Sequence, residues 1–388
     1  MPTVSESDRA AVARDTAAAL RRFAPRAADR PVMLGFDGFV DSIIDVVDKR
    51  HDVQRYAPID TIATFGQRVS GAAGHSTNFE LVVKQRKLGG NGPIMANAMA
   101  AAGFDVTYIG ALGEPEIDPV FRELADRARV HTVIANGATD ALEFTDGKLL
   151  LGKYDHLAAL TYDRICQVIG EDKFTEIIAR SHLIGMVNWT MLTSLDTIWD
   201  GLAERILPAI GQRRGDKPMF FVDLCDPVKR TTADLQAALA RLRKLAAQVH
   251  VVLGVNLKES REVAEAMSLP VDADSDVDLH QRAAALREAL GIQCVVVHAR
   301  RAAGAAVEQD DAAAEFVGPF VRKPYLSTGA GDNFNAGFCL GLLAGLPLVQ
   351  SLCAGTATSG YYVRQGASPT LDQLADFCDA LPEPEDEV

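Results

Sequence analysis

The chain has 388 residues, of which 48% are hydrophobic, and it carries a formal net charge of -13 at pH 7. This length and apolar content allow a large buried core, in one large α/β domain or in two to three smaller domains. The negative charge and the lack of a long Lys or Arg run argue against nucleic acid as a partner, because its phosphates require a basic surface. No apolar run reaches membrane-spanning length.

The two ends of the chain differ in composition from the rest. Residues 1–30 place charged side chains among alanines, which predicts an amphipathic helical extension and not a signal peptide. Residues 381–388 form an acidic tail, predicted to be disordered. The six cysteines are widely spaced without a Cys-x-x-Cys pair, so we interpret them as reduced. Together these features predict a cytoplasmic protein.

Residues 31–36 form the first clear strand, and two carboxylates, Asp37 and Asp41, follow it. Ligands of open α/β sheets bind at the carboxyl ends of strands, and a carboxylate can accept hydrogen bonds from two sugar hydroxyls. Both residues are therefore candidates for substrate binding. For Asp37, a turn-forming role is an equally ordinary use of the side chain.

Residues 42–87 form a long, polar connection, and long inserts of this kind are often lids or binding loops. The basic residues at its end, Lys84, Arg86 and Lys87, either face a phosphate or form a solvated surface, which is the commoner use of such a run. Further on, a strand is predicted over 130–135, and β-like runs within 141–151 predict a hairpin.

A glycine pair, Gly89 and Gly90, precedes Asn91 and an Ala-rich helix over 94–102. Glycines before a helix start permit close approach of the backbone to a ligand. For each glycine alone, a purely structural role is an equally good explanation.

The second half alternates short apolar strands with longer helical stretches, which predicts a parallel sheet with helices on both faces. The expected strands are 182–187, 218–223, 249–254 and 292–298. Asn256 and Glu259 follow the third of these strands. An Asn followed by Glu three residues later is a helix capping box, but the same pair can also organise Mg2+, which keeps much of its water shell.

The segment from Ser327 to Gly345 has the most specific pattern in the chain. Gly329, Ala330 and Gly331 form a turn of small residues that leads into a helix of apolar residues. The free N–H groups of a helix's first turn can hold a phosphate-sized anion, and Asp332 at that turn can take a proton from an attacking hydroxyl. A plain loop with an Asp cap remains the alternative.

The string Thr-Gly-Ala-Gly-Asp from Thr328, followed by Phe334, Ala336 and Gly337, resembles the C-terminal signature of the pfkB (ribokinase-like) family of carbohydrate and nucleoside kinases. The Gly-Gly pair at Gly89 and its Ala-rich helix resemble the family's N-terminal signature. The resemblance covers about residues 31–366. It implies a central, mostly parallel sheet with helices on both faces, within a domain over 31–380, and a small β lid drawn from about 42–87 and 130–155.

The resemblance also implies an activity, namely transfer of the γ-phosphoryl group of ATP to a hydroxyl of a sugar or related polyol, with Mg2+. Asp332 would act as the base beside the amides of Gly329, Ala330 and Gly331. Substrate binding is implied for Asp41, Gly89, Gly90 and Asn91, metal binding for Glu259. Nucleotide binding is implied for a further set of residues: Asn256, His298, Thr328 and Gly355.

Some positions depart from the family pattern. His298 stands where a Thr-x-Gly usually borders the nucleotide, and Gly355 where an Asn often appears. Leu326 replaces an Asp that supports a monovalent cation, so dependence on such a cation is not assumed.

Several alternatives stay open at this point. The acceptor could be a nucleoside or a sugar phosphate, and the chain could bind nucleotide or sugar without catalysis. An oxidoreductase reading lacks the Gly-x-Gly-x-x-Gly motif that it needs. Lids of this type often pair in related kinases, which makes a homodimer through the lid a further expectation.

Overall fold

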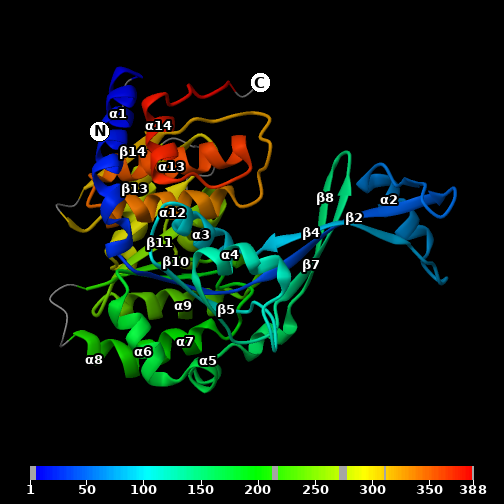
Figure 1. Cartoon of the computed structure of the whole chain (residues 1–388), viewed down its shortest axis with the longest axis horizontal. Helices are drawn as coiled ribbons and strands as arrows, with labels where there is room; N and C mark the ends of the chain where they lie inside the picture. Colours follow the sequence, from blue (N-terminus) through cyan, green and yellow to red (C-terminus); the bar gives the residue numbers. More distant parts are fainter. Residues whose placement is uncertain (1–5, 212–216, 271–277, 310–311, 387–388) are drawn as a thin grey trace.

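The computed structural model describes residues 6–211, 217–270, 278–309 and 312–386. Within them, two β-sheets organise the molecule (Figure 1). A nine-stranded sheet lies in the body, and a five-stranded sheet projects from it as a lid. No helix in these ranges is long and apolar enough to cross a membrane.

The body sheet has the strand order β14-β13-β12-β11-β10-β9-β1-β5-β6. Its strands pair in parallel from β12 to β6, while β13 is antiparallel to both of its neighbours. The predicted mostly parallel sheet is therefore confirmed. The strands are β1 (Val32–Phe36), β5 (Val106–Gly110), β6 (Arg129–Thr132), β9 (Leu183–Val187), β10 (Met219–Asp223), β11 (His250–Asn256), β12 (Cys294–His298), β13 (Ala302–Val307) and β14 (Ala313–Val317).

Helices cover both faces of this sheet because its strands are apolar on both sides. Phe220 packs into one hydrophobic core and its neighbour Phe221 into the other. The helices on the Phe221 face are α1 (Glu6–Phe23), α3 (Asn91–Ala101), α4 (Arg122–Arg127), α12 (Ala330–Leu343), α13 (Leu348–Gln365) and α14 (Leu371–Asp379). Those on the Phe220 face are α5 (Tyr162–Ile169), α6 (Glu171–Arg180), α7 (Leu195–Gly201), α8 (Leu207–Gly211), α9 (Thr232–Leu245), α10 (Leu257–Ala266) and α11 (Leu279–Leu290).

The two ends of the chain pack against the body. The predicted N-terminal helix forms as α1 and buries Ala17 and Leu20 against α13 and α14. The acidic tail differs from the prediction of disorder over its described part, since the Glu385 N–H donates to the Phe320 carbonyl at 3.1 Å. Residues 1–5 and 387–388 lie outside the described ranges.

The lid is a mixed sheet with a small core of its own. Its strands and single helix are β2 (Phe39–Arg50), β3 (Tyr56–Pro58), β4 (Leu81–Gly89), β7 (Gly137–Phe144), β8 (Gly147–Lys153) and α2 (Ile62–Gly71). Phe65 of α2 packs against Phe79 and Phe144, with ring centroids 5.1 and 5.6 Å away. The predicted hairpin is β7–β8. The predicted strand over 130–135 is instead β6 of the body sheet, because it pairs in parallel with β5.

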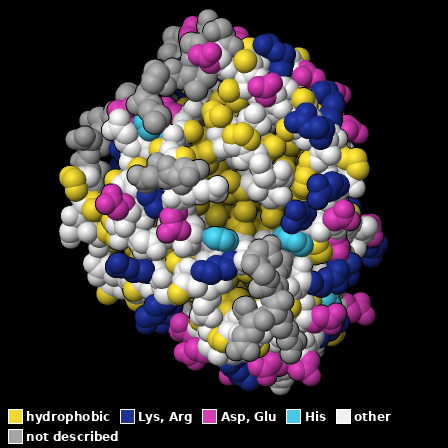
Figure 2. All heavy atoms as spheres, turned by 90° about the vertical axis from the view of Figure 1, so that its left-hand side faces the viewer, with side chains coloured by type: hydrophobic (Ala, Val, Ile, Leu, Met, Phe, Trp, Pro, Cys, Tyr) yellow, Lys and Arg dark blue, Asp and Glu magenta, His cyan; other side chains and the backbone are white. Residues whose placement is uncertain are grey.

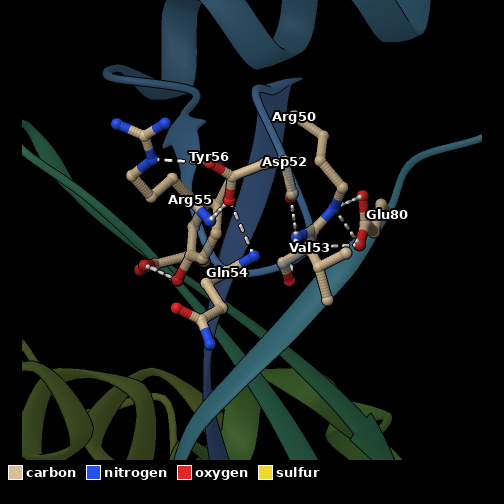
Figure 3. A network of polar contacts seen from close by, with 8 residues as sticks. Arg50, Asp52, Val53, Gln54, Arg55, Tyr56 and Glu80 are labelled. Atoms are coloured by element: carbon tan, nitrogen blue, oxygen red, sulfur yellow. Dashed lines mark hydrogen bonds and ion pairs between the residues drawn. The ribbon is translucent and has the colours of Figure 1, made fainter.

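Exposed polar contacts hold the outer end of the lid (Figure 3). Arg50, the last residue of β2, forms an ion pair with Glu80 and also donates to the carbonyls of Asp52 and Val53 at 3.2 Å. The Asp52 carboxylate accepts the Arg55 N–H at 2.8 Å and so closes the turn towards β3. On the face of the molecule away from the lid, acidic and basic side chains are interspersed around an apolar centre (Figure 2).

The lid strands that reach the body do so at glycines. Gly38 precedes β2, Gly89 ends β4, and Gly137 begins β7. A Cβ atom built on Gly38 would collide with the Ala111 carbonyl, and one on Gly137 would lie 2.6 Å from the Phe39 ring. At Gly38 the backbones are therefore too close for a side chain, and at Gly137 the Phe39 ring fills the space that a side chain would need.

Candidate active site

The glycine turn before α12 forms as the sequence predicts. Gly329 adopts φ 89°, a left-handed conformation that favours glycine, and α12 begins at Ala330. A cavity of about 620 Å³ opens beside this helix start, and Ala330 and Gly331 are part of its lining. The first-turn N–H groups of α12 are thus next to a space of ligand size.

Asp332 lies in this first helical turn and is 6% exposed. Its Oδ1 atom accepts a hydrogen bond from the side-chain amide of Asn91 at 2.9 Å. Burial raises the pKa of the Asp332 carboxyl from 3.8 to about 8; the Asn91 bond opposes this shift, and the nearby charges of Asp37 and Glu259 add to it. A carboxylate with a pKa near neutrality is suited to proton transfer at physiological pH.

Asp37 holds the segment that carries Asn91. Its carboxylate accepts the N–H groups of Asn91 and Gly92 at 3.0 and 2.8 Å, and the side-chain amide of Asn188 at 2.7 Å. Burial raises its pKa to about 6. The side chain is 0% exposed and enclosed by these donors. It anchors the start of α3, as an acidic residue at a helix N-terminus can, and its substrate contact stays a prediction.

Asp41 lies on β2 of the lid, close to the same segment. A Cβ atom built on Gly89 would be 2.5 Å from the Asp41 Cγ atom, so only glycine allows this approach. Burial raises the pKa of Asp41, while a hydrogen bond with Thr139 and the charge of Lys87 lower it. Asp41 and Asp332 therefore both contact the segment from Gly89 to Asn91, which contains Gly90 as the N-cap of α3.

Two further carboxylates, those of Asp223 and Glu259, lie near Asp332. Burial raises the pKa of Asp223 well above its usual value, and the charges of Glu259 and Asp332 raise it further. Asn335 donates to Asp223 at 2.7 Å. Both oxygens of Glu259 accept backbone N–H groups, from Asp226 at 2.8 Å and from Asn256 at 2.9 Å.

The Asn256–Glu259 capping box is present, with both of its hydrogen bonds. Among the described residues, no three His, Cys, Asp or Glu side chains are grouped to bind a metal ion by themselves. The repulsion between the Asp223 and Glu259 carboxylates nevertheless fits a nearby cation, because a positive charge would lower both raised pKa values. With the oxygens of Glu259 occupied by N–H groups, contact through water suits Mg2+.

Two of the residues that were predicted to bind nucleotide line the 620 Å³ cavity. Asn256 and His298 line it, and burial lowers the pKa of His298 to about 4, which leaves a neutral ring against Phe334. Thr328 is exposed, and its carbonyl accepts a hydrogen bond from the Tyr362 hydroxyl at 2.9 Å. Gly355 is buried where α13 packs on the Phe334 ring, and its nucleotide contact stays a prediction.

Sequence reasoning missed residues that support the site from a distance in the chain. Asn188, with φ 64°, directly follows β9 and holds Asp37. Cys225 and Asp226 follow β10 in left-handed conformations, which lets the Asp226 N–H reach Glu259. Their positions after strand ends were a usable signal, because the carboxyl ends of neighbouring parallel strands meet at one edge of a sheet.

Several solved carbohydrate kinases share this fold. A carbohydrate kinase from Agrobacterium tumefaciens aligns with a TM-score of 0.60 at 16% identity, covering 91% of this chain and 98% of that one. Ribokinase of Arabidopsis thaliana, solved with ribose and ATP, gives 0.59 at 16% identity, with coverage of 90% and 98%. Phosphofructokinase-2 from Escherichia coli gives 0.59 at 16% identity, with coverage of 91% and 99%. These likenesses show a ribokinase-like fold.

Sequence comparison narrows the class. A family model described as prokaryotic ketohexokinase matches residues 8–381. A ketohexokinase of Haloferax volcanii is 31% identical over 354 residues, covering 89% of this chain and 90% of that protein. The chain therefore belongs to the prokaryotic ketohexokinase family. It is a carbohydrate kinase, a phosphotransferase with an alcohol acceptor.

Proposed function

We propose that this enzyme transfers the γ-phosphoryl group of ATP to a hydroxyl of a ketohexose. The observation that carries the proposal is the position of Asp332. It lies at the start of α12, whose first residues border the cavity, and Asn91 ties it to the segment that contacts Asp41. Asp332, as the base, thus lies between the cavity, which can take the phosphoryl donor, and Asp41, a carboxylate that can bind the acceptor. The ketohexokinase of Haloferax volcanii supports a ketohexose as that acceptor.

In this mechanism Asp332 accepts the proton of the attacking hydroxyl. Its Oδ1 atom is engaged by Asn91, so Oδ2 receives the proton. The N–H groups of Ala330 and Gly331 hold the charge on the transferred phosphoryl group, and this fixed electrostatic stabilisation contributes more than the base because the alcohol loses its proton late.

Mg2+ bound with the nucleotide would neutralise phosphate charge during the transfer. Glu259, Asn256 and Asp223 are the residues that would hold its water shell, since the charges of Glu259 and Asp332 act on Asp223, and Asn256 lines the cavity. On the other side, Asp41 accepts hydroxyls of the sugar, and Gly89, which has no side chain, lets Asp41 lie against the segment that leads to Asn91.

A coupled ADP-release assay tests the function. The purified enzyme is given ATP and Mg2+ with D-fructose, D-tagatose, D-glucose, D-ribose, fructose 6-phosphate or adenosine, and each reaction is repeated with excess EDTA. We expect the highest kcat/KM with a ketohexose and no turnover in EDTA. Preference for adenosine or for the sugar phosphate would overturn the acceptor assignment. Unchanged turnover in EDTA would overturn the role of Mg2+.

We also propose that the enzyme forms a homodimer through its lid. Six of the nine large hydrophobic side chains that are most exposed in the described residues belong to the lid, namely Val53, Val69, Leu81, Val83, Leu150 and Leu151. Such a concentration on one small unit is typical of an interface. Light scattering should give a dimer that Leu150→Asp converts to a monomer, whereas Val228→Asp, at an exposed position of the body, should remain dimeric.

A further inference from the structure

The segment from Gly318 to Val321 forms one wall of the 620 Å³ cavity. It follows β14 and has no regular secondary structure. Arg300 and Arg301, which also line the cavity, stack on the Phe320 ring with guanidinium carbons 5.3 and 5.6 Å from its centroid. The position of Phe320 therefore sets the position of two cationic side chains at the cavity.

Two carbonyls of this wall, those of Pro319 and Phe320, are held by groups that are not part of the cavity lining. Arg364 of α13 donates to Pro319 O at 2.8 Å and to Gly360 O at 2.9 Å, which ties the wall to α13. Phe320 O accepts the backbone N–H of Glu385 at 3.1 Å. Without regular structure of its own, the wall depends on these outside donors to satisfy its backbone.

The acidic tail contributes a second bond through its side chain. The Glu385 carboxylate accepts the N–H of Arg322, just after the wall, at 3.0 Å, and its ion pair with the Arg322 guanidinium lies at 3.5 Å. These bonds lower the pKa of Glu385. The tail thus contacts both Phe320 and the residue that follows the wall.

The N-terminal helix reaches the other end of the wall. Arg9 of α1 is only 5% exposed, and its Nε donates to Val317 O at 2.9 Å, one residue before Gly318. The same guanidinium donates to Pro382 O at 2.7 Å and to the Glu383 carboxylate at 3.0 Å. One buried arginine therefore joins α1, the tail and the start of the wall.

We propose that α1 and the acidic tail form a brace that fixes the donor-facing wall, with Arg9 and Glu385 as positioning residues for the nucleotide. This inference rests on the proposed function, since it takes the cavity as the ATP site. An unbraced wall would have to be ordered when the nucleotide binds, and that ordering cost weakens affinity for the donor. The sugar site, built from the lid and α3, has no contact with the brace among the bonds described above.

The test compares Arg9→Ala, Glu385→Ala and a chain ending at residue 381 with the wild type. Each variant is assayed for the KM of ATP, the KM of the acceptor and the Kd of ADP by calorimetry. Arg21→Ala is the matched control, because Arg21 lies on the same helix and forms ion pairs with Asp376 and Asp379 of α14, away from the wall.

We expect the KM of ATP and the Kd of ADP to rise about fivefold for the single substitutions, the scale of one lost hydrogen bond, and further for the shortened chain. The KM of the acceptor should stay within about twofold, and Arg21→Ala should match the wild type. Glu385→Gln keeps an oxygen for the Arg322 N–H and should show a smaller rise than Glu385→Ala.

Unchanged donor constants in all three variants would overturn the brace, as would an equal rise in the KM values of donor and acceptor. Glu385 is exposed enough that its substitution leaves the fold intact, and a melting curve of each variant checks this. If the wild type binds ADP but phosphorylates no acceptor, the proposed function fails while the calorimetric comparison still decides on the brace.

Discussion

The body and the lid hold their two key carboxylates in different ways. In the body, Asp332 is buried and bonded to Asn91, which is itself fixed by the wholly buried Asp37. In the lid, Asp41 is half-buried on a strand. The core beneath that strand has only four buried side chains, Ile44, Val46, Ile59 and Leu142. The body is thus organised to fix the reacting groups, whereas the lid can change its side chains at small cost to the fold.

The largest expected effect comes from Asp332→Asn, which removes the base on the body side. We expect kcat to fall by about 100-fold or more, the usual scale for a general base. The measurement is steady-state turnover with ATP and the best acceptor. A kcat within about threefold of the wild type would contradict the role of Asp332.

Melting temperature provides the control for this variant. Because the folded pKa of Asp332 is raised from 3.8 to about 8, its stabilising contribution is present below pH 4 and is lost as pH rises through 8. Asn has no carboxyl group to ionise, so the Asn variant does not lose stability in this way as the pH rises. It should therefore be at least as stable as the wild type at pH 9, and a lower melting temperature there would point to damage of the fold.

On the lid side, Asp41→Asn should raise the KM of the acceptor by roughly 30-fold, since it weakens charged hydrogen bonds to sugar hydroxyls worth about 2 kcal/mol. The KM of ATP should stay within about twofold. A loss confined to kcat would show that Asp41 acts in catalysis and would remove the contrast between the two regions.

The dependence of kcat/KM on pH tests the role of Asp332 in the body without a mutation. With a pKa of about 8 in the free enzyme, Asp332 is mostly protonated at pH 7, so kcat/KM for the acceptor should rise about tenfold from pH 7 to pH 9 and then level off. Initial rates at low acceptor concentration measure this profile. A flat profile from pH 6 to pH 9 would contradict the raised pKa of Asp332.

The smallest effect is expected at the outer end of the lid. Arg50→Ala removes the exposed ion pair with Glu80, and such pairs contribute less than about 1 kcal/mol. Turnover and the KM of the acceptor should stay within about twofold. A large rise in KM would show that the lid depends on this end to hold its shape.

Local sequence patterns predicted much of the fold and the centre of the site. The glycine turn before Asp332 and the Gly89–Gly90 pair before α3 were recognisable, because the backbone geometry of such turns is determined by residues that are close together in the sequence. The burial of Asp37 and Gly355 could not be predicted, because it depends on which way each residue faces. A sequence shows that a side chain follows a strand or lies on a helix, but not whether it points into the core, where Asp37 is 0% exposed.

Long-range contacts escaped prediction for another reason. The bond from Arg9 to Val317 joins residues 308 positions apart, and no pattern in either segment indicates the other. The strand over 129–132 was placed in the lid because it precedes the β7–β8 hairpin, yet its partner is β5 in the body. Pairing partners of short strands depend on the whole sheet.

The distance of a lid residue from the glycines at which the lid meets the body determines how far a rotation of the lid would move that residue. Asp41 lies three residues beyond Gly38 and Arg50 lies twelve, which at about 3.3 Å per residue places them roughly 10 and 40 Å from that pivot. A swing that carries the outer end of the lid through about 4 Å shifts Asp41 by only about 1 Å. Phosphoryl transfer is sensitive to displacements of that size. Any rotation of the projecting sheet about these glycines would therefore move Asp41 only about a quarter as far as the outer end of the lid.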